Sequence, residues 1–375
     1  MTKHCFWAFV CVGMFTPAMA DPPADLAGPL QTLRAVGPNG QGSAAANAAW
    51  KKAAAAGAPA LPAVLNAMDG ANDYAMNWLR PAADAIVERE TAAGNKLPLT
   101  DLGKFLLDTS HHPRTRRFAF ELIARADAST ADALLAGMLN DPSLELRHDA
   151  VRALIAQADE ALVRTNKAGA GLLLQQALGA ARDVPQIEGI AEKLEALGQP
   201  VNLQRHFGFL TNWKVIGPFD NTERKGFDTV FPPEEKLDLA AEYEGKCRKV
   251  KWQDFQTAHK YGMVDMNQPC GKLKEVTGYA TTEFFVAAAR PVELRLGGKN
   301  SWKLWLNGKL LFEHDEYHAN TEIDQYPMPA QLQAGRNVVL VKVCQNEEVE
   351  EWTNEWEFQL RITDALGTPI AAAKN

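Results

Sequence analysis

The feature of this chain that most constrains its fold is a change in the spacing of apolar residues near position 200. Before it, apolar residues recur every three to four positions, as in 146–158, which is the period of an amphipathic helix. After it they alternate with other residues, as in 356–362, which is the period of a strand. We therefore predict two separate cores, an α-helical one over residues 21–200 and a β one over residues 207–371.

The helical region contains a repeating pattern. Aligning Ala119 with Ala150 gives a repeat of about 31 residues, as expected for stacked pairs of antiparallel helices. The stretch 141–154, which opens with an Asp-Pro-Ser helix start, resembles the HEAT-repeat family, and 116–119 and 78–82 follow the same pattern more loosely. This resemblance implies a stacked helical surface that binds a protein partner. The uneven spacing leaves an irregular helical bundle as the alternative.

The β region has the turn chemistry of short antiparallel strands. Asn307-Gly308 separates two apolar segments and is the strongest two-residue hairpin signal, because both turn positions need positive φ. The Val-rich stretch 337–344 is apolar on both faces, as in a strand that is buried on both sides. Short strands separated by such turns indicate a sandwich. The predicted fold class is therefore multidomain, with α-helical repeats followed by an antiparallel β-sandwich.

Three motifs carry a second resemblance. They are Trp-Lys-Val-Ile-Gly-Pro-Phe at 213–219, Trp-Leu-Asn-Gly at 305–308 and Leu-Gln-Ala-Gly-Arg-Asn at 332–337. Together they resemble the galactose-binding-like jelly-roll domains, and their combination with a HEAT-like half is similar to secreted bacterial proteins of unknown function. The resemblance implies a jelly roll that binds carbohydrate or another cell-surface component.

The first twenty residues have the pattern of a secretory signal peptide. Lys3 precedes the apolar run 5–15, and Ala18-Met-Ala20 fits signal peptidase, so we predict cleavage after Ala20, with an uncleaved anchor as the alternative. No later segment is long and apolar enough to predict a transmembrane helix. We expect a secreted or periplasmic protein. The net charge of -7, with no concentrated basic segment, argues against nucleic acid as a partner.

Three cysteines follow the predicted signal peptide: Cys247, Cys270 and Cys344. An oxidising compartment favours pairing, although spacing alone leaves each pairing, or none, open. We predict a Cys247–Cys270 disulfide, because both residues lie in a polar, strand-poor segment that a covalent link would order. Cys344 ends an apolar strand and is expected to be a buried thiol.

Trp305 is the first candidate for ligand contact. If Leu304 and Leu306 face the core, strand alternation turns Trp305 outward, where its indole would offer a platform for a sugar ring. The alternative is that another part of the chain covers it. The polar segment that follows supplies the other candidate ligand-binding residues: His314, Asp315, Glu316, Tyr317, His318 and Asn320.

The remaining tryptophans of this half have different expected surroundings. Trp213, Trp302 and Trp356 are expected in the core, because they lie on the apolar positions of predicted strands. Trp352 lies in an acidic loop that we expect to be solvated.

We predict no metal site and no catalytic residue. His314 and His318 could share zinc on a helix, but this segment continues a strand, where residues four apart are separated by about 13 Å. No third ligand is evident. No cofactor is expected, apart from a structural calcium that Asp315, Glu316 or Asp324 could ligate. Nucleophile elbows, phosphate-binding loops and Cys-His dyads are absent from the sequence.

These observations predict a non-catalytic binding or scaffold protein. The helical repeats would contact a protein partner, and the sandwich would bind carbohydrate or another cell-surface ligand. A purely structural or oligomerisation module is one alternative, and it predicts that Trp305 is buried. A glycoside hydrolase-like enzyme is another, because the separation of two carboxylates cannot be read from sequence.

Overall fold

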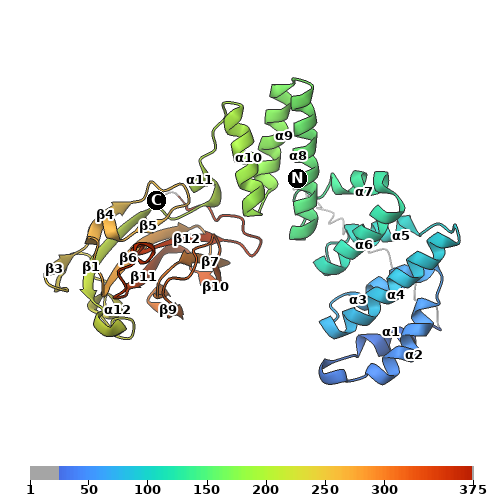
Figure 1. Ribbon diagram of the computed structural model, residues 1–375, viewed down its shortest axis with the longest axis horizontal. Helices are drawn as coiled ribbons and strands as arrows, with labels where there is room; N and C mark the ends of the chain where they lie inside the picture. The colour runs from blue at the N-terminus through green and yellow to red at the C-terminus, as the bar shows by residue number, and fades with distance from the viewer. Residues whose placement is uncertain (1–24, 374–375) are drawn as a thin grey trace, which may run out of the picture. The chain divides into compact units, whose positions relative to one another are not determined.

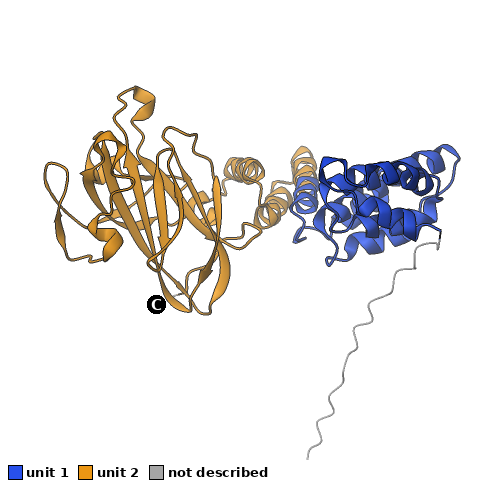
Figure 2. Cartoon of the chain, turned by 90° about the horizontal axis from the view of Figure 1, so that it is seen from below, with its two compact units in different colours: residues 1–153 blue, residues 154–375 orange. Residues whose placement is uncertain are grey.

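A computed structural model describes residues 25–373 and shows helices followed by antiparallel sheets (Figure 1). The predicted signal peptide lies outside the described residues. The chain divides into two compact units, residues 1–153 and 154–375 (Figure 2). None of the helices in residues 25–373 combines the length and the apolar character that a membrane crossing needs.

Seven helices and the first half of an eighth form the described part of unit 1. The helices are α1 (Ala27–Arg34), α2 (Ser43–Ala54), α3 (Leu61–Met68), α4 (Asp73–Ala92), α5 (Leu99–Leu107), α6 (Pro113–Ala126), α7 (Ala128–Leu135) and α8 (Leu144–Val163). Short 3-10 helices at Pro38–Gly40 and Ala58–Ala60 precede α2 and α3. The apolar faces of these helices bury one continuous core, which includes Leu79, Phe105 and Phe118.

Successive helices of unit 1 pack in pairs, and their starts follow the capping chemistry of the sequence. α3 packs against α4, and α5 packs against α6. Asn72 caps α4 by accepting a hydrogen bond from the backbone N–H of Ala75, and α6 begins with Pro113. α8 begins 31 residues after α6, as the alignment predicts, but α6 begins 40 residues after α4. The repeat length therefore varies along the helical region.

A buried ion pair joins α6 to the segment that precedes α8. Both terminal nitrogens of Arg116 donate to the carboxylate of Asp141, at 2.8 and 2.6 Å. Asp141 also accepts from the backbone N–H of Ser143 at 2.8 Å, one residue before the helix begins at Leu144. The Asp-Pro-Ser segment thus precedes a helix, but the helix begins at Leu144 and Pro142 is not its first residue as predicted. The Asp141 side chain instead binds the preceding helix pair.

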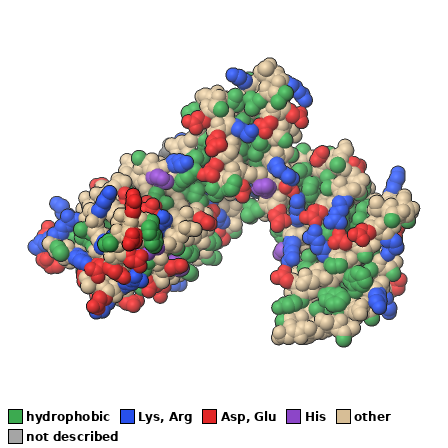
Figure 3. Space-filling view, in the orientation of Figure 1, with side chains coloured by type: hydrophobic (Ala, Val, Ile, Leu, Met, Phe, Trp, Pro, Cys, Tyr) green, Lys and Arg blue, Asp and Glu red, His purple; other side chains and the backbone are tan. Residues whose placement is uncertain are grey.

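Surface ion pairs link α4 to α6. Arg80 pairs with Glu121 at 2.6 Å and Arg125 with Asp84 at 2.7 Å, and each pair spans 41 residues. On the face drawn in Figure 3, acidic and basic side chains are intermixed over this part of unit 1.

Unit 2 includes the last helices as well as the sheets. After the second half of α8 come α9 (Lys167–Ala180), α10 (Val184–Ala196) and α11 (Leu203–Phe207). The secondary structure changes type between Phe207 and Asn212, close to the predicted position, but the compact units divide at Ala153/Leu154, inside α8.

Contacts with the sandwich explain this difference. Arg182 donates to the Thr368 hydroxyl at 3.2 Å, the buried Arg361 donates to the carbonyl of Phe207 at 3.0 Å, and the Tyr261 hydroxyl donates to Glu188. The helices after α8 therefore belong with the strands and not with the earlier helix pairs.

Twelve strands follow in the described residues. They are β1 (Asn212–Asp220), β2 (Glu242–Glu244), β3 (Lys249–Lys251), β4 (Gln253–Gln256), β5 (Val264–Asp265), β6 (Val276–Val286), β7 (Arg290–Gly298), β8 (Trp302–Leu306), β9 (Lys309–His314), β10 (Tyr326–Leu332), β11 (Gly335–Gln345) and β12 (Glu357–Thr363). Short helices occur at Thr222–Arg224, Pro232–Glu235 (α12), Asn267–Cys270 (α13) and Glu351–Thr353.

Two antiparallel sheets form the sandwich. One has six strands in the order β4-β1-β6-β11-β8-β9, and the other has four in the order β10-β7-β12-β5. Their facing sides enclose a core that includes Trp213, Trp302 and Trp356, as predicted. The two-residue turn between β8 and β9 is also confirmed, because Asn307 and Gly308 have φ of 53° and 79°.

A second apolar cluster lies on the opposite face of the six-stranded sheet. Segment 221–252, which contains α12, β2 and β3, supplies Phe231, Val250 and Trp252 to this cluster. Trp305 is 8% exposed there, together with Tyr279 and Leu340. The alternation of β8 does turn Trp305 away from the sandwich core, but segment 221–252 covers it. The alternative, in which another part of the chain covers the indole, therefore holds, and Trp305 is not an exposed platform for a ligand.

Candidate functional site

Five loops of unit 2 meet at one end of the six-stranded sheet. Register places the ends of β1, β11 and β9 beside the starts of β6 and β8: Asp220 pairs with Val276, Gln345 with Val276, and His314 with Trp302. We call this region the loop end. It comprises residues 221–225, 271–275, 299–301, 315–320 and 346–355.

Trp352 is the most exposed tryptophan of residues 25–373, with 60% of its surface accessible. It lies in the short helix Glu351–Thr353, whose buried Thr353 donates its hydroxyl to the carbonyls of Glu348 and Glu350. These bonds fix the loop that presents the indole. The prediction of a solvated loop is confirmed for Trp352 itself.

His318 packs against this indole. The two ring centroids lie 5.1 Å apart at an interplanar angle of 77°, an edge-to-face contact. The His318 Nε2 lies 3.1 Å from the Asn346 Oδ1 and 3.3 Å from the Glu348 carboxylate. These contacts fix the imidazole between the loop that follows β9 and the loop that follows β11.

Arg224 contacts the loop of Trp352 from a third loop. Its guanidinium donates to both carboxylate oxygens of Glu347, at 3.0 and 2.6 Å, and to Glu348 at 3.3 Å. It also stacks over the Tyr317 ring, with 5.1 Å to the centroid. The hydrogen bond to Glu347 raises the pKa of Arg224, and the same bond lowers the pKa of the Glu347 carboxyl, so the pair stays ionised.

Tyr317 connects this cluster to the interior. Its hydroxyl accepts a hydrogen bond from the Asn221 amide at 3.1 Å, and the same amide donates to the carbonyl of Gln345 at 2.9 Å. Burial raises the pKa of Tyr317 to about 12, so the phenol is neutral under ordinary conditions.

The other predicted ligand-binding residues have separate partners. The His314 Nε2 lies 2.9 Å from Glu316 and 2.9 Å from the Tyr326 hydroxyl, while Asp315 accepts from the Ser301 hydroxyl at 2.7 Å. The backbone carbonyl of Asn320 accepts from Gln325. Of the predicted set, the structure therefore brings Tyr317 and His318 to the Trp352 cluster, and it places His314 and Glu316 in a second cluster beside Tyr326.

Asp324, one of the three residues predicted as possible calcium ligands, instead accepts hydrogen bonds from two arginines. Arg361 donates to it at 2.6 Å from Nε, and Arg295 donates at 2.6 Å from Nη1. Burial raises the pKa of Asp324, but the hydrogen bonds and charges of Arg361 and Arg295 outweigh this effect, and the net pKa is lowered. The Asp324 carboxylate is thus the negatively charged partner of Arg295 and Arg361 in a structural network. In residues 25–373, His, Cys, Asp and Glu side chains form no group of three placed to hold a metal ion.

The predicted Cys247–Cys270 disulfide is not formed. Both residues are free thiols, Cys247 exposed and Cys270 buried. The Cys270 side chain belongs to the sandwich core, where burial raises its pKa to about 12. The two thiols are in different environments because Cys270 turns inward, although its carbonyl accepts from the neighbouring Arg248 at 2.7 Å. Cys344 is buried, as predicted.

Sequence reasoning missed Arg224, Asn221 and the role of Trp352. Asn221 contacts residues 96 and 124 positions away, and Arg224 contacts Glu347, 123 positions away. Contacts between residues this far apart in the sequence cannot be inferred from the local spacing of residue types. The only available signal was a lone tryptophan in an otherwise acidic segment.

Comparisons with known proteins identify no family. No family model and no curated protein matches this chain. Fourteen chains of known structure match, among them the GH31 alpha-xylosidase from Xanthomonas citri, at 12% identity over 30% of this chain and with a TM-score of 0.19. The match spans 15% of the xylosidase chain. A similarity of this size carries no argument about fold or activity.

Proposed function

We propose that this chain is an exported, non-catalytic binding protein whose β-sandwich binds carbohydrate at the loop end. The proposal rests on the exposed indole of Trp352, which packs in a T-shaped contact against His318 beside hydrogen-bonding side chains from three loops. An indole face covers the C–H face of a sugar ring, and neighbouring carboxylates and guanidinium groups exchange hydrogen bonds with its hydroxyls.

The surroundings of Trp352 support binding without chemistry. The carboxylates of Glu347 and Glu348 are bonded to Arg224, and Glu348 also lies 3.3 Å from His318. Carboxylates that are held by hydrogen bonds in this way keep further lone pairs with which to accept hydrogen bonds from hydroxyl groups. The loop end therefore provides an aromatic platform bordered by charged hydrogen-bonding groups.

The helical region would contact a protein partner. Support comes from its paired, antiparallel packing and from the HEAT-like stretch 141–154, since stacked helix pairs present extended binding surfaces. Exposed apolar side chains on these helices, such as Leu107 at 56%, would add contact area.

One observation favours the structural alternative, in which the sandwich binds nothing. That alternative predicts a buried Trp305, and Trp305 is buried. The two functions differ in their use of Trp352, because a structural module needs no exposed indole at the loop end.

A glycan array probed with the full chain tests the proposal. We expect retention of a limited set of oligosaccharides by the wild-type chain and loss of that retention in Trp352→Ala. Tyr74→Ala is the matched control, since Tyr74 is also an exposed aromatic, at 49%, but lies on α4 in unit 1. Absence of retention by the folded wild-type chain, or equal retention by both variants, would contradict carbohydrate binding at the loop end.

A further inference from the structure

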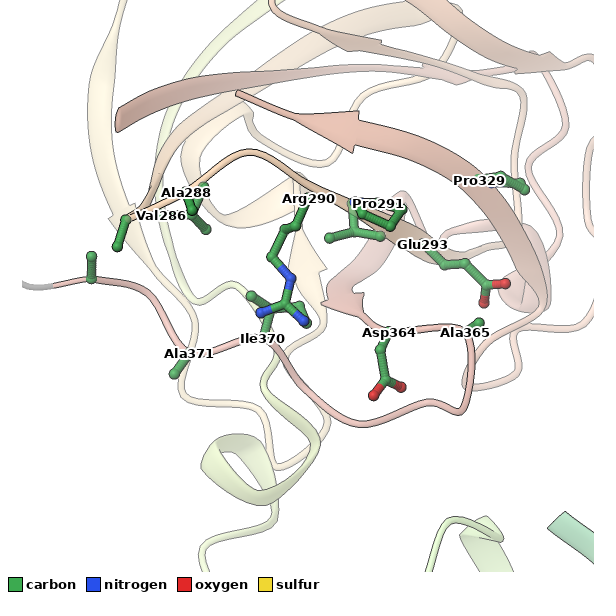
Figure 4. A pocket seen from close by; sticks show the side chains of 13 residues that line it. Val286, Ala288, Arg290, Pro291, Glu293, Pro329, Asp364, Ala365, Ile370 and Ala371 are labelled. Carbon is green, nitrogen blue, oxygen red and sulfur yellow. The ribbon is translucent and has the colours of Figure 1, made fainter. Parts of the chain in front are cut away.

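A cavity of about 840 Å³ lies at the end of the sandwich opposite to the loop end (Figure 4). Its walls are formed by the end of β6, the turn that follows, the start of β7, one residue of β10 and the segment after β12. This volume is within the range of roughly 300–1,000 Å³ that is typical of small-molecule sites. No sequence motif pointed to this region.

Most of the cavity lining is apolar. Val286, Ala288, Pro291, Pro329 and Ile370 contribute aliphatic side chains to it. The segment after β12 is fixed as one wall, because the backbone N–H of Ile370 donates to the carbonyl of Ile362 at 2.9 Å and that of Ala373 donates to the carbonyl of Phe285 at 2.8 Å. A hydrocarbon group would therefore find an ordered apolar surface here.

Three charged residues also line the cavity, and two of them are already bonded. Glu293 accepts from the Arg295 guanidinium at 3.0 and 2.7 Å. Asp364 accepts from the backbone N–H groups of Leu366 and Thr368, each at 2.9 Å. Both carboxylates thus have a role in holding the fold.

Arg290 is the exception. Within residues 25–373 no hydrogen bond or ion pair joins its guanidinium to another residue. In Figure 4 its side chain extends from the start of β7 toward Ile370, while the carboxylates of Glu293 and Asp364 lie on the other side of the pocket. The charged group of the lining that has no protein partner is therefore the exposed guanidinium of Arg290, which lies beside an apolar wall.

We propose that this cavity binds a small carboxylate that carries a hydrocarbon body. The guanidinium of Arg290 would hold the carboxylate through two parallel hydrogen bonds, a geometry that arginine favours, and the apolar lining would cover the hydrocarbon. This site is independent of the carbohydrate site, because the two involve opposite ends of the sandwich and share no residue.

Calorimetric titration of the full chain with decanoate, below its micellar concentration, tests this proposal. We expect saturable binding at one site, with 1-decanol bound about tenfold more weakly, as expected for loss of one charge-assisted contact. Arg290→Gln should weaken decanoate binding about tenfold and leave decanol binding unchanged. Ala288→Trp, which places an indole in the cavity from an exposed turn, should abolish binding of both ligands.

The matched control is Arg336→Gln. This change removes an exposed cation that pairs with Glu283 at 2.6 Å, outside the cavity, and should leave decanoate binding unchanged. The proposal is overturned if decanoate does not saturate the wild-type chain, if Arg290→Gln binds it as tightly, or if decanol binds as well as decanoate. Tighter binding of decylammonium would assign the site to Glu293 and Asp364, and would also overturn it.

Discussion

The Nζ of Lys342 lies 2.8 Å from the Oε1 of Glu234, and the lysine side chain is completely buried on the outer face of the six-stranded sheet. Nζ also donates to the carbonyls of Phe227 and Thr229, at 2.9 and 2.8 Å. Burial lowers the pKa of Lys342, and the charge of Glu234 opposes that effect. Lys342 on β11 thus binds segment 221–252 through three hydrogen bonds and holds it over Trp305.

Lys342→Met should destabilise the sandwich strongly. It leaves Glu234 buried without its cation, a change that costs about 3–5 kcal/mol. Guanidinium unfolding followed by tryptophan fluorescence measures this free energy. The double variant Lys342→Met/Glu234→Gln should recover part of the loss, and a single variant that costs less than about 1 kcal/mol would show that the pair does not hold the segment.

Asp141→Ala should destabilise unit 1 by a similar amount, about 3–5 kcal/mol, because Arg116 is 1% exposed and would keep an unpaired charge. Lys104→Ala is the control. It breaks the exposed pair with Asp101 at 3.1 Å, and should cost less than about 1 kcal/mol. Circular dichroism during thermal unfolding compares the two. Equal effects would contradict the structural role of the buried pair.

Tyr317→Phe should make stability less sensitive to alkali. The pKa of Tyr317 is raised from 10.0 to about 12 in the folded protein, chiefly by burial. A raised pKa means that the folded state retains the proton longer than the unfolded state, so this contribution is present below pH 10 and is lost as the pH rises toward 12. The variant lacks the phenol and should lose less stability across this interval. An identical pH dependence of the unfolding free energy would contradict the burial of Tyr317.

Gly226→Ala should destabilise the sandwich by about 1–3 kcal/mol, the usual cost of overpacking. A Cβ at this position would lie 2.6 Å from the Asp220 carbonyl and 2.7 Å from the Asn221 Oδ1. Gly179→Ala is the matched control, because a Cβ there meets nothing within 4 Å, and a helical Gly→Ala change should stabilise by about 0.4–1 kcal/mol. Thermal melting of both variants measures the difference; equal melting temperatures would refute the close packing at Gly226.

Local patterns predicted the elements of this fold well. The positive φ values of Asn307 and Gly308 and the burial of Trp213 both follow from short-range rules of turn chemistry and alternation. The same alternation placed Trp305 on the correct face of β8. It could not predict that segment 221–252 would fold over that face, since this depends on Lys342 meeting Glu234, 108 positions away.

Predictions that depended on long-range partners were less successful. The Cys247–Cys270 disulfide was inferred from composition, which carries no information on the direction of the Cys270 side chain. Asp324 was a reasonable oxygen ligand by residue type. Its partners Arg295 and Arg361, however, come from two strands of the four-stranded sheet, which the sequence around Asp324 does not indicate. The loop end likewise assembles from five segments, so that only Tyr317 and His318 of its Trp352 cluster were identified beforehand.

The most direct test of the central claim is a calorimetric titration with the oligosaccharide that the glycan array retains best. Wild type and Tyr74→Ala should bind it with the same affinity, and Trp352→Ala should bind it at least about tenfold more weakly, as expected when an aromatic contact residue is truncated. Binding that is unchanged in Trp352→Ala would place the carbohydrate away from the loop end and contradict this account.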